Sequence, residues 1–131
     1  DSAHNIKLLD QMPEIYVDPS TVLEPGYTVF QLPQGEGLMF EESGERKFRD
    51  VMDGTSNTIM VVESSMDAAV PWTKPADLEI DMADPLARTG NVHQGGFHVV
   101  MADGAVIFLT NSIDLELFRA LLTRAGKEII P

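Results

Sequence analysis

Cysteine is absent from this 131-residue chain, which excludes disulfide bonds, thiolate catalysis and cysteine-ligated zinc sites. Basic residues are few, since 9 Lys and Arg stand against 21 Asp and Glu and leave a formal net charge of −12. Such an acidic chain is repelled by nucleic-acid phosphates and by anionic membrane surfaces, so we expect neither as a partner. No apolar run approaches the roughly 18 residues that a membrane-spanning helix needs.

The length and composition predict a single soluble domain over residues 1–131. An apolar content of 44% is ordinary for a folded protein, and 131 residues are enough to bury one hydrophobic core. Short strand and helix signals separated by turns indicate the α+β class. The strongest strand signal covers 57–63, and weaker strands at 27–32 and 37–42 would extend the same antiparallel sheet.

The segment FHVVMADGAVIFLT predicts a β-hairpin with strands 97–102 and 105–110. Asp103-Gly104 supplies the two residues with positive φ that a type I′ turn requires. In the resulting register Val100 faces Ile107. Both faces of the hairpin are apolar, so we expect it to lie at the centre of the sheet and to be covered on both sides.

A helix over 112–125 is the clearest helical signal in the chain. Its sequence carries an apolar stripe at helical spacing, Ser112 is placed to cap its start, and Gly126 is placed to end it. We expect this helix to pack on one face of the hairpin. The stretch 64–96 holds three prolines and predicts a long irregular loop, and such loops in compact domains are often functional.

Candidate binding residues flank or occupy that loop: Glu63, Trp72, Lys74 and His93. Glu63 ends a predicted strand on the same side as Ile59, where a buried carboxylate needs a partner. Trp72 is the single tryptophan and lies near two prolines, so it is either a binding hot spot or a lid on the sheet. Lys74 would either bind a ligand or, in the structural interpretation, form an ion pair with Glu63 or with an acidic residue of the loop.

The hairpin contributes Asp103 and Gly104 as further candidate residues, together with two histidines. An extended strand of roughly 20 Å separates His93 from Asp103, so the two are not expected to form a catalytic pair. Turn chemistry explains Asp103 and Gly104 better than a reactive role does. A structural role is also favoured for His93, since a lone histidine is weak evidence for ligation, and His98 is expected in the core or at its margin.

A row of acidic residues follows the Trp72 loop. Asp77, Glu79 and Asp81 alternate with apolar residues, which places their carboxylates on one side of an extended chain. Hard oxygen ligands suit calcium, but the EF-hand pattern fails because Met82 stands where its glycine belongs. A solvated edge strand is the favoured interpretation, and a divalent cation stays open as a partner.

No catalytic or cofactor motif stands out. The sequence contains no G-x-S-x-G elbow, no H-E-x-x-H pair, no P-loop and no dinucleotide fingerprint. No nucleophile, base and orienting group form a recognisable set. The chain is therefore not expected to be an enzyme, and no cofactor is predicted.

Three motifs in order resemble those of a large bacterial family of prepilin-like proteins of unknown function. His93, nine intervening residues and Asp103-Gly104 match its C-terminal H-x9-D-G signature. FRDVMDGTSNTIMVVE (48–63) resembles its D-G-T-S-N-T segment, and AVPWTKPADLEID (69–81) resembles its W-T-K-P-x-D-L loop. Together the similar segments cover about half the chain, so the resemblance is more specific than any one motif.

The resemblance implies the architecture of type IV pilins and type II secretion pseudopilins. Full-length members carry a prepilin-type signal and a hydrophobic N-terminal helix, so this chain would be the head that follows them. The first hypothesis is a non-enzymatic, exported pseudopilin-like module, anchored in the cell envelope and bound to protein partners in a filament, secretion or surface assembly. The family has also carried a solute-binding label, and the alternative hypothesis is a ligand- or metal-binding domain that uses the 64–96 loop.

Overall fold

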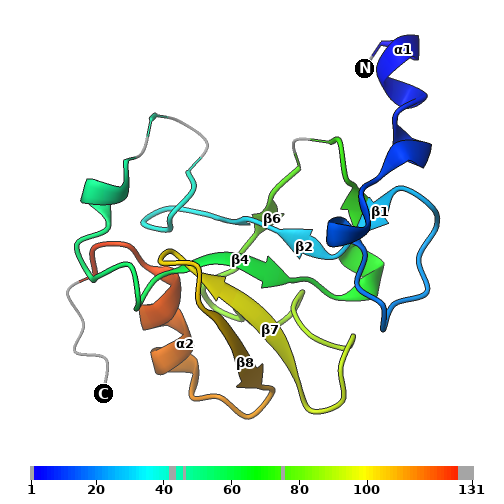
Figure 1. The fold of residues 1–131 in the computed structure, drawn as a ribbon. Helices are drawn as coiled ribbons and strands as arrows, with labels where there is room; N and C mark the ends of the chain where they lie inside the picture. Colours follow the sequence, from blue (N-terminus) through cyan, green and yellow to red (C-terminus); the bar gives the residue numbers. More distant parts are fainter. Residues whose placement is uncertain (1, 42–43, 46, 75, 127–131) are drawn as a thin grey trace.

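The structure, a computed structural model, describes residues 2–41, 44–45, 47–74 and 76–126. The fold is α+β, as the sequence predicts: an antiparallel sheet in the order β2-β4-β7-β8 packs against one C-terminal helix, α2 (Figure 1). These elements are β2 (Phe30–Gln31), β4 (Ile59–Glu63), β7 (Gly96–Met101), β8 (Val106–Thr110) and α2 (Leu115–Leu122).

Short elements surround the main sheet. Two small pairs, β1 with β5 and β3 with β6, extend the fold beyond β2, and one-turn helices lie along the connecting segments. Among the described residues, no helix combines the length and the apolar character needed to cross a bilayer. The bounds are β1 (Tyr27–Thr28), β3 (Pro33–Gln34), β5 (Val70–Pro71), β6 (Leu78–Glu79), α1 (Ala3–Ile6), η1 (Leu9–Gln11), η2 (Glu14–Tyr16), η3 (Phe48–Asp50) and η4 (Met66–Ala68).

The strands predicted at 27–32 and 37–42 are corrected in part. Residues 27–32 contain two short strands, and β2 does extend the main sheet through its pairing with β4. Residues 37–41 form no strand and make isolated bridges, such as that of Leu38 to Thr123, because the chain turns towards the end of α2 there. Residue 42 lies outside the described part of the chain.

The main core lies between the sheet and α2. Alternate residues of β7, namely Phe97, Val99 and Met101, are fully buried on this face. The ring of Phe97 meets that of Phe118 on α2 edge to face, with 5.7 Å between the ring centroids. The helix therefore covers one face of the hairpin, as its amphipathic sequence predicts.

The helix begins and ends at different residues from those predicted. Asp114 caps it in place of Ser112, because its carboxylate accepts the main-chain N–H of Leu117 at 3.0 Å. Thr123 has an extended backbone and ends the helix three residues before Gly126. The expected helix over 112–125 is thus real but shorter at both ends.

The predicted type I′ turn of the hairpin is wrong. Asp103 has no positive φ, whereas Gly104 has a φ of 90°. Met101 donates its N–H to the carbonyl of Ala105 at 2.8 Å and accepts from the N–H of Gly104 at 2.9 Å. These bonds define a three-residue loop that ends in a glycine bulge, which is the next commonest hairpin connection after the two-residue turns.

The extra loop residue shifts the register by one. Val100 faces Val106 instead of Ile107, and a shift of one residue moves every side chain of β8 to the opposite face. The hairpin is also not central, because β8 is the last strand of the sheet. The expectation of cover on both sides is wrong for this strand, where Val106, Ile107 and Phe108 are 66%, 40% and 44% exposed.

An irregularity in β4 divides its residues between the two faces. The pairing with β7 shifts between Ile59 and Val61, so Met60 is an extra residue in the strand. Ile59 and Val62 consequently belong to the buried core beneath α2. Glu63 points to the opposite face, which corrects the prediction that Ile59 and Glu63 share a side.

Candidate metal centre

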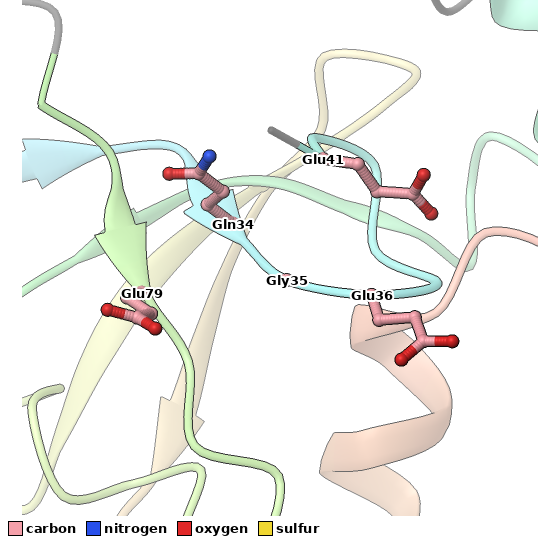
Figure 2. A pocket seen from close by; sticks show the side chains of 5 residues that line it. All are labelled: Gln34, Gly35, Glu36, Glu41 and Glu79. Carbon is pink, nitrogen blue, oxygen red and sulfur yellow. The ribbon is translucent and has the colours of Figure 1, made fainter. Parts of the chain in front are cut away.

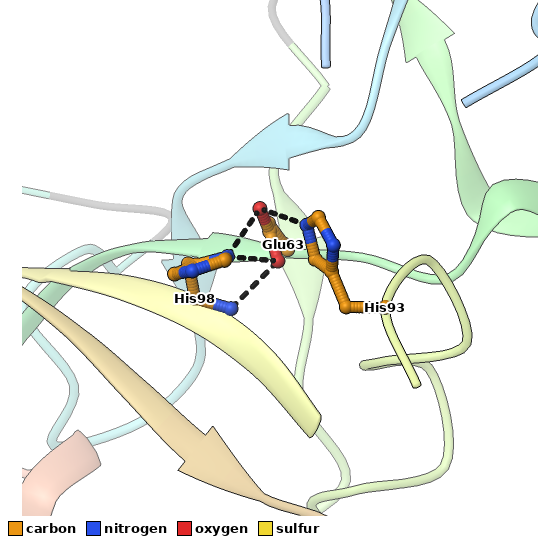
Figure 3. Close-up of side chains that lie close together, drawn as sticks. All are labelled: Glu63, His93 and His98. Carbon is orange, nitrogen blue, oxygen red and sulfur yellow. Dashed lines mark hydrogen bonds and ion pairs between the residues drawn. The ribbon is translucent and has the colours of Figure 1, made fainter. Parts of the chain in front are cut away.

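A carboxylate and an imidazole lie next to each other on the sheet face opposite α2. Because Val62 pairs with Val99, the next residues, Glu63 of β4 and His98 of β7, are neighbours on the other face. His98 donates its main-chain N–H to Glu63 Oε2 at 2.6 Å, and its Nδ1 lies 3.1 Å from Oε1 (Figure 3). The sheet register alone creates this pair.

His93 reaches the same carboxylate from the loop that precedes β7 (Figure 3). Its Nε2 lies 3.4 Å from Glu63 Oε1, and its ring meets that of His98 edge to face at 4.7 Å between centroids. Gly95, with a φ of 85°, allows the sharp turn between His93 and the strand, and a bridge joins His93 to Gly96. The loop therefore folds back over the sheet and brings the two histidines together.

Asp18 adds a second buried carboxylate from the N-terminal segment. Its Oδ2 lies 3.2 Å from His93 Nε2, and its Oδ1 accepts the N–H of Ser20 at 2.7 Å. Burial raises the pKa of Asp18, but the Ser20 amide, a hydrogen bond with the Glu63 carboxyl and the nearby His93 outweigh burial and hold the pKa below its ordinary 3.8. Asp18 is consequently ionised at neutral pH.

The spacing of these groups suits a metal ion. One ligand atom each from Glu63, His93 and His98 lies within 4.8 Å of the others. A tetrahedral zinc site with bonds of about 2.0–2.1 Å separates its ligand atoms by roughly 3.4 Å. The contacts of 3.1, 3.2 and 3.4 Å in this centre are close to that separation. Small side-chain movements would therefore let one ion replace the direct contacts.

Trp72 and Lys74 lie in other surroundings. The indole Nε1 of Trp72 donates to the carbonyl of Leu9 at 3.2 Å, and its ring stacks on Tyr16 with 5.7 Å between centroids. Lys74 is exposed and lines a cavity of about 320 Å³ with the N-terminal segment. Trp72 thus fastens the N-terminal segment to the loop, and neither residue is among the groups that surround Glu63.

Asp103 and Gly104 lie at the tip of the hairpin and act in the turn. The Asp103 carboxylate accepts the N–H of Ala105 at 2.9 Å, while its own N–H donates to Thr55. His93 instead contacts Asp18 and Glu63. Of the six candidates from the sequence, the structure brings together Glu63 and His93.

Sequence reasoning missed the other two members of the centre, Asp18 and His98. His98 stands among apolar residues, and it becomes a neighbour of Glu63 through strand pairing alone. Asp18 is separated from His93 by 75 positions. Strict alternation along β7, with His98 on the face opposite Phe97 and Val99, was the one available signal for His98.

A second polar cavity of about 340 Å³ lies where β3 and β6 end (Figure 2). Glu79, from the predicted acidic row, lines it, and the alternation of buried Leu78 with exposed Glu79 confirms an extended segment there. Glu41 also lines it but is held by Arg124 at 2.6 Å. No histidine lines this cavity, which has the character of a solvated acidic surface. The lining residues are Gln34, Gly35, Glu36, Glu41 and Glu79.

The fold and the site define an α+β domain with a histidine–carboxylate centre on the sheet face opposite its helix. Residues 17–86 and 76–116 match the sequence profile of the family described as "Protein of unknown function (DUF1559)". The two segments cover most of the chain and include all four residues of the centre, so the chain belongs to this family. No curated protein and no solved structure matches the chain.

Proposed function

We propose that this domain binds a divalent transition-metal ion at the centre formed by Asp18, Glu63, His93 and His98. The observation that carries the proposal is the convergence of ligand atoms of Glu63, His93 and His98 within 4.8 Å of one another. Glu63 comes from β4, His93 from the loop before β7 and His98 from β7. Asp18 comes from the N-terminal segment. One ion would thus join four parts of the chain.

The charge of the centre supports a cation. Asp18 and Glu63 are 4% and 3% exposed, and buried carboxylates are costly unless they are compensated. Within the described residues, the ion pairs of both carboxylates are with histidines, not with lysine or arginine. A divalent cation that displaces the proton of the Asp18–Glu63 hydrogen bond offsets the negative charge of both carboxylates while the imidazoles stay neutral. Protons on the imidazoles would compete with the metal, so affinity falls as the pH is lowered.

The ligand types favour particular metals and a particular role. Imidazole nitrogens with carboxylates suit zinc, copper, iron or nickel, whereas calcium and magnesium prefer oxygen ligands throughout. Glu63, His93 and His98 supply three ligands, and Asp18, which lies 3.2 Å from His93 Nε2, would supply the fourth after a side-chain movement. Four protein ligands then close a tetrahedral shell, which is the arrangement of a structural site. We therefore propose a structural or ligand-binding centre and not an enzyme.

Thermal melting tests this proposal. The chain is melted after EDTA treatment and dialysis, and then with zinc, nickel, calcium or magnesium added back. Zinc or nickel is expected to raise Tm with increasing concentration, and binding at 100 times Kd adds about 2.7 kcal/mol to the free energy of unfolding. Calcium and magnesium are expected to have little effect. Absence of a shift with every ion would refute the proposal.

Histidine variants locate the ion. His93→Gln and His98→Gln are each expected to remove most of the zinc-induced shift in Tm. The chain has three histidines, and the third, His4, is exposed on α1, so His4→Gln is the matched control. Loss of the shift in the His4 variant, or its persistence in both others, would place the ion elsewhere.

A second, compatible proposal concerns the biological setting. The order of the three prepilin-like motifs supports a pseudopilin-like head of a longer, exported, envelope-anchored protein with protein partners. The test is the full-length gene product: a prepilin-type signal with a hydrophobic helix, and recovery of the protein with the cell envelope, are expected. A full-length product without such a helix would overturn this setting and leave the metal proposal intact.

A further inference from the structure

β8 is an edge strand that lacks the usual protection of sheet edges. Its sequence, VIFLT, contains no charged residue and no proline, the two commonest devices that stop an edge from pairing with another chain. Val106 and Phe108 are 66% and 44% exposed on the face opposite α2, and Ile107 is 40% exposed on the other face. Both faces of the strand thus offer apolar side chains to a neighbour.

The outward backbone groups of β8 follow from its pairing with β7. Met101 and Ala105 share a hydrogen bond, and hydrogen-bonded pairs alternate along an antiparallel ladder. The N–H and C=O groups of Val106, Phe108 and Thr110 consequently point away from β7, and of these the C=O of Thr110 already accepts the N–H of Ile113 at 3.0 Å. These three residues are symmetric about Phe108, the middle residue of the strand.

We propose that two copies of this chain associate through β8, antiparallel and edge to edge, about a two-fold axis at Phe108. In this register Phe108 faces Phe108 of the second copy, and Val106 faces Thr110 of the second copy. Every outward N–H of the three residues then gains an acceptor, and the Thr110 C=O accepts the Val106 N–H of the second copy in addition to that of Ile113. The two sheets become one continuous sheet with the helices α2 on one side and the histidine–carboxylate centres on the other.

The symmetry of the edge favours a second copy over an unrelated strand. A two-fold contact requires a surface that complements itself. The outward N–H and C=O groups at positions 106, 108 and 110 can pair with the same groups of a second copy when the two strands are centred on Phe108. Phe108 is already positioned, because its ring packs edge to face on His98 at 5.0 Å between centroids. Little side-chain entropy is therefore lost when the two phenylalanines meet.

The charge of the chain makes the association weak and salt-dependent. Each copy carries a net charge of −12, and Asp103 and Asp114 lie just beyond the two ends of β8. Repulsion between copies is screened by salt, so higher ionic strength strengthens the contact. A contact of one short strand with another buries less than a standard interface, and we expect a reversible dimer that requires high protein concentration.

Sedimentation equilibrium tests the association, with EDTA present so that no metal bridges two copies. The wild-type chain is expected to shift from monomer towards dimer with rising concentration, and more so at high salt. Val106→Pro removes an outward N–H without loss of a bond to β7 and is expected to abolish the dimer, whereas Val106→Thr keeps that N–H and retains it. A monomer at all concentrations, or equal behaviour of the two variants, would overturn the proposal.

Cysteine cross-linking tests the register, since the chain has no cysteine of its own. Phe108→Cys is expected to form a disulfide-linked dimer on mild oxidation, because facing residues in hydrogen-bonded pairs have Cα atoms about 5.5 Å apart. Val106→Cys mixed with Thr110→Cys is expected to give the mixed dimer in preference to either self-linked dimer. Val22→Cys, exposed in a distant loop, is the control for random collision. Equal cross-linking of every pair would rule out this register.

Discussion

The two faces of the four-stranded sheet differ in cover, composition and chemistry. The face beneath α2 is apolar and dry, with Phe97 and Val99 at its centre. The opposite face carries the buried Glu63, the half-buried His98 and the exposed Phe108 in adjacent positions across the strands. Neighbouring residues of the same strands therefore have unrelated roles, and the two-residue period of a strand separates them.

The two faces of the sheet allow a small domain to combine a hydrophobic core with a site. One face supplies the apolar burial that stabilises a chain of this length. Because hydrophobic burial is supplied by the face beneath α2, the opposite face tolerates two buried carboxylates that are paired with histidines. The stability of the domain and its proposed binding function are thus separable by mutation.

The largest effect is expected on the covered face. Phe97→Ala removes a fully buried ring that packs on Phe118, and we expect the free energy of unfolding to fall by about 3–5 kcal/mol. Val100→Ala, on the opposite face and only partly buried, is the matched control and is expected to cost much less. Urea denaturation with EDTA present measures both. Equal losses would contradict the division of the sheet into a core face and a site face.

A smaller loss is expected from the site face. Glu63→Ala removes the acceptor of the His98 N–H and the partner of both imidazoles, and a hydrogen bond to a charged group contributes about 1.5–3 kcal/mol. The variant is also expected to show no rise of Tm with zinc. Glu79→Ala, at an exposed carboxylate, is the control and should change neither quantity. A zinc response that survives Glu63→Ala would remove this residue from the metal site.

The hairpin turn determines which residues of β8 lie on which face of the sheet. Gly104 has a φ of 90°, and a Cβ there would meet no atom within 4 Å, so a substitution costs backbone strain alone. Gly104→Ala is expected to lower the free energy of unfolding by about 1–2 kcal/mol. Gly104→Asn is expected to cost less, because asparagine tolerates this conformation. An unchanged Tm in Gly104→Ala would contradict the glycine bulge.

The smallest effect concerns pH. The folded state holds the pKa of Asp18 below 3.8, so the ionised carboxylate stabilises the fold above that pH, and this stabilisation is lost as the pH falls through the lowered pKa. Wild type is therefore expected to be more stable than Asp18→Asn at neutral pH in EDTA, and the difference should shrink as the pH falls below 3.8 and through the lowered pKa of Asp18. Melting curves across this range provide the check. A difference independent of pH would show that the charge of Asp18 contributes nothing.

Much of the fold could be predicted from local patterns. The β-branched run before Glu63, the hairpin around Asp103-Gly104 and the amphipathic helix after it all exist, and the helix covers the face expected of it. The turn type was predicted wrongly because a two-residue and a three-residue loop share the same Asp-Gly signal. That single residue reversed the faces of β8.

The candidate site could be predicted only in part. Glu63 and His93 were singled out because a carboxylate among apolar residues and a histidine before a glycine pair are unusual. Asp18 gave no such signal, and the alternation along β7 that places His98 opposite Phe97 does not show what His98 contacts. The pairing of β4 with β7 and the return of the loop through Gly95 bring these residues together.

Periodicity, turn residues and ordered motifs are local properties of a chain, so the class of the fold, the position of its hairpin and helix, and membership of a family of unknown function could be predicted from the sequence. The register of β8, its place at the sheet edge and the contacts among Asp18, Glu63, His93 and His98 depend on the three-dimensional structure. The physical reason is that register and convergence arise from pairing between segments far apart in the chain, where a shift of one residue exchanges the two faces.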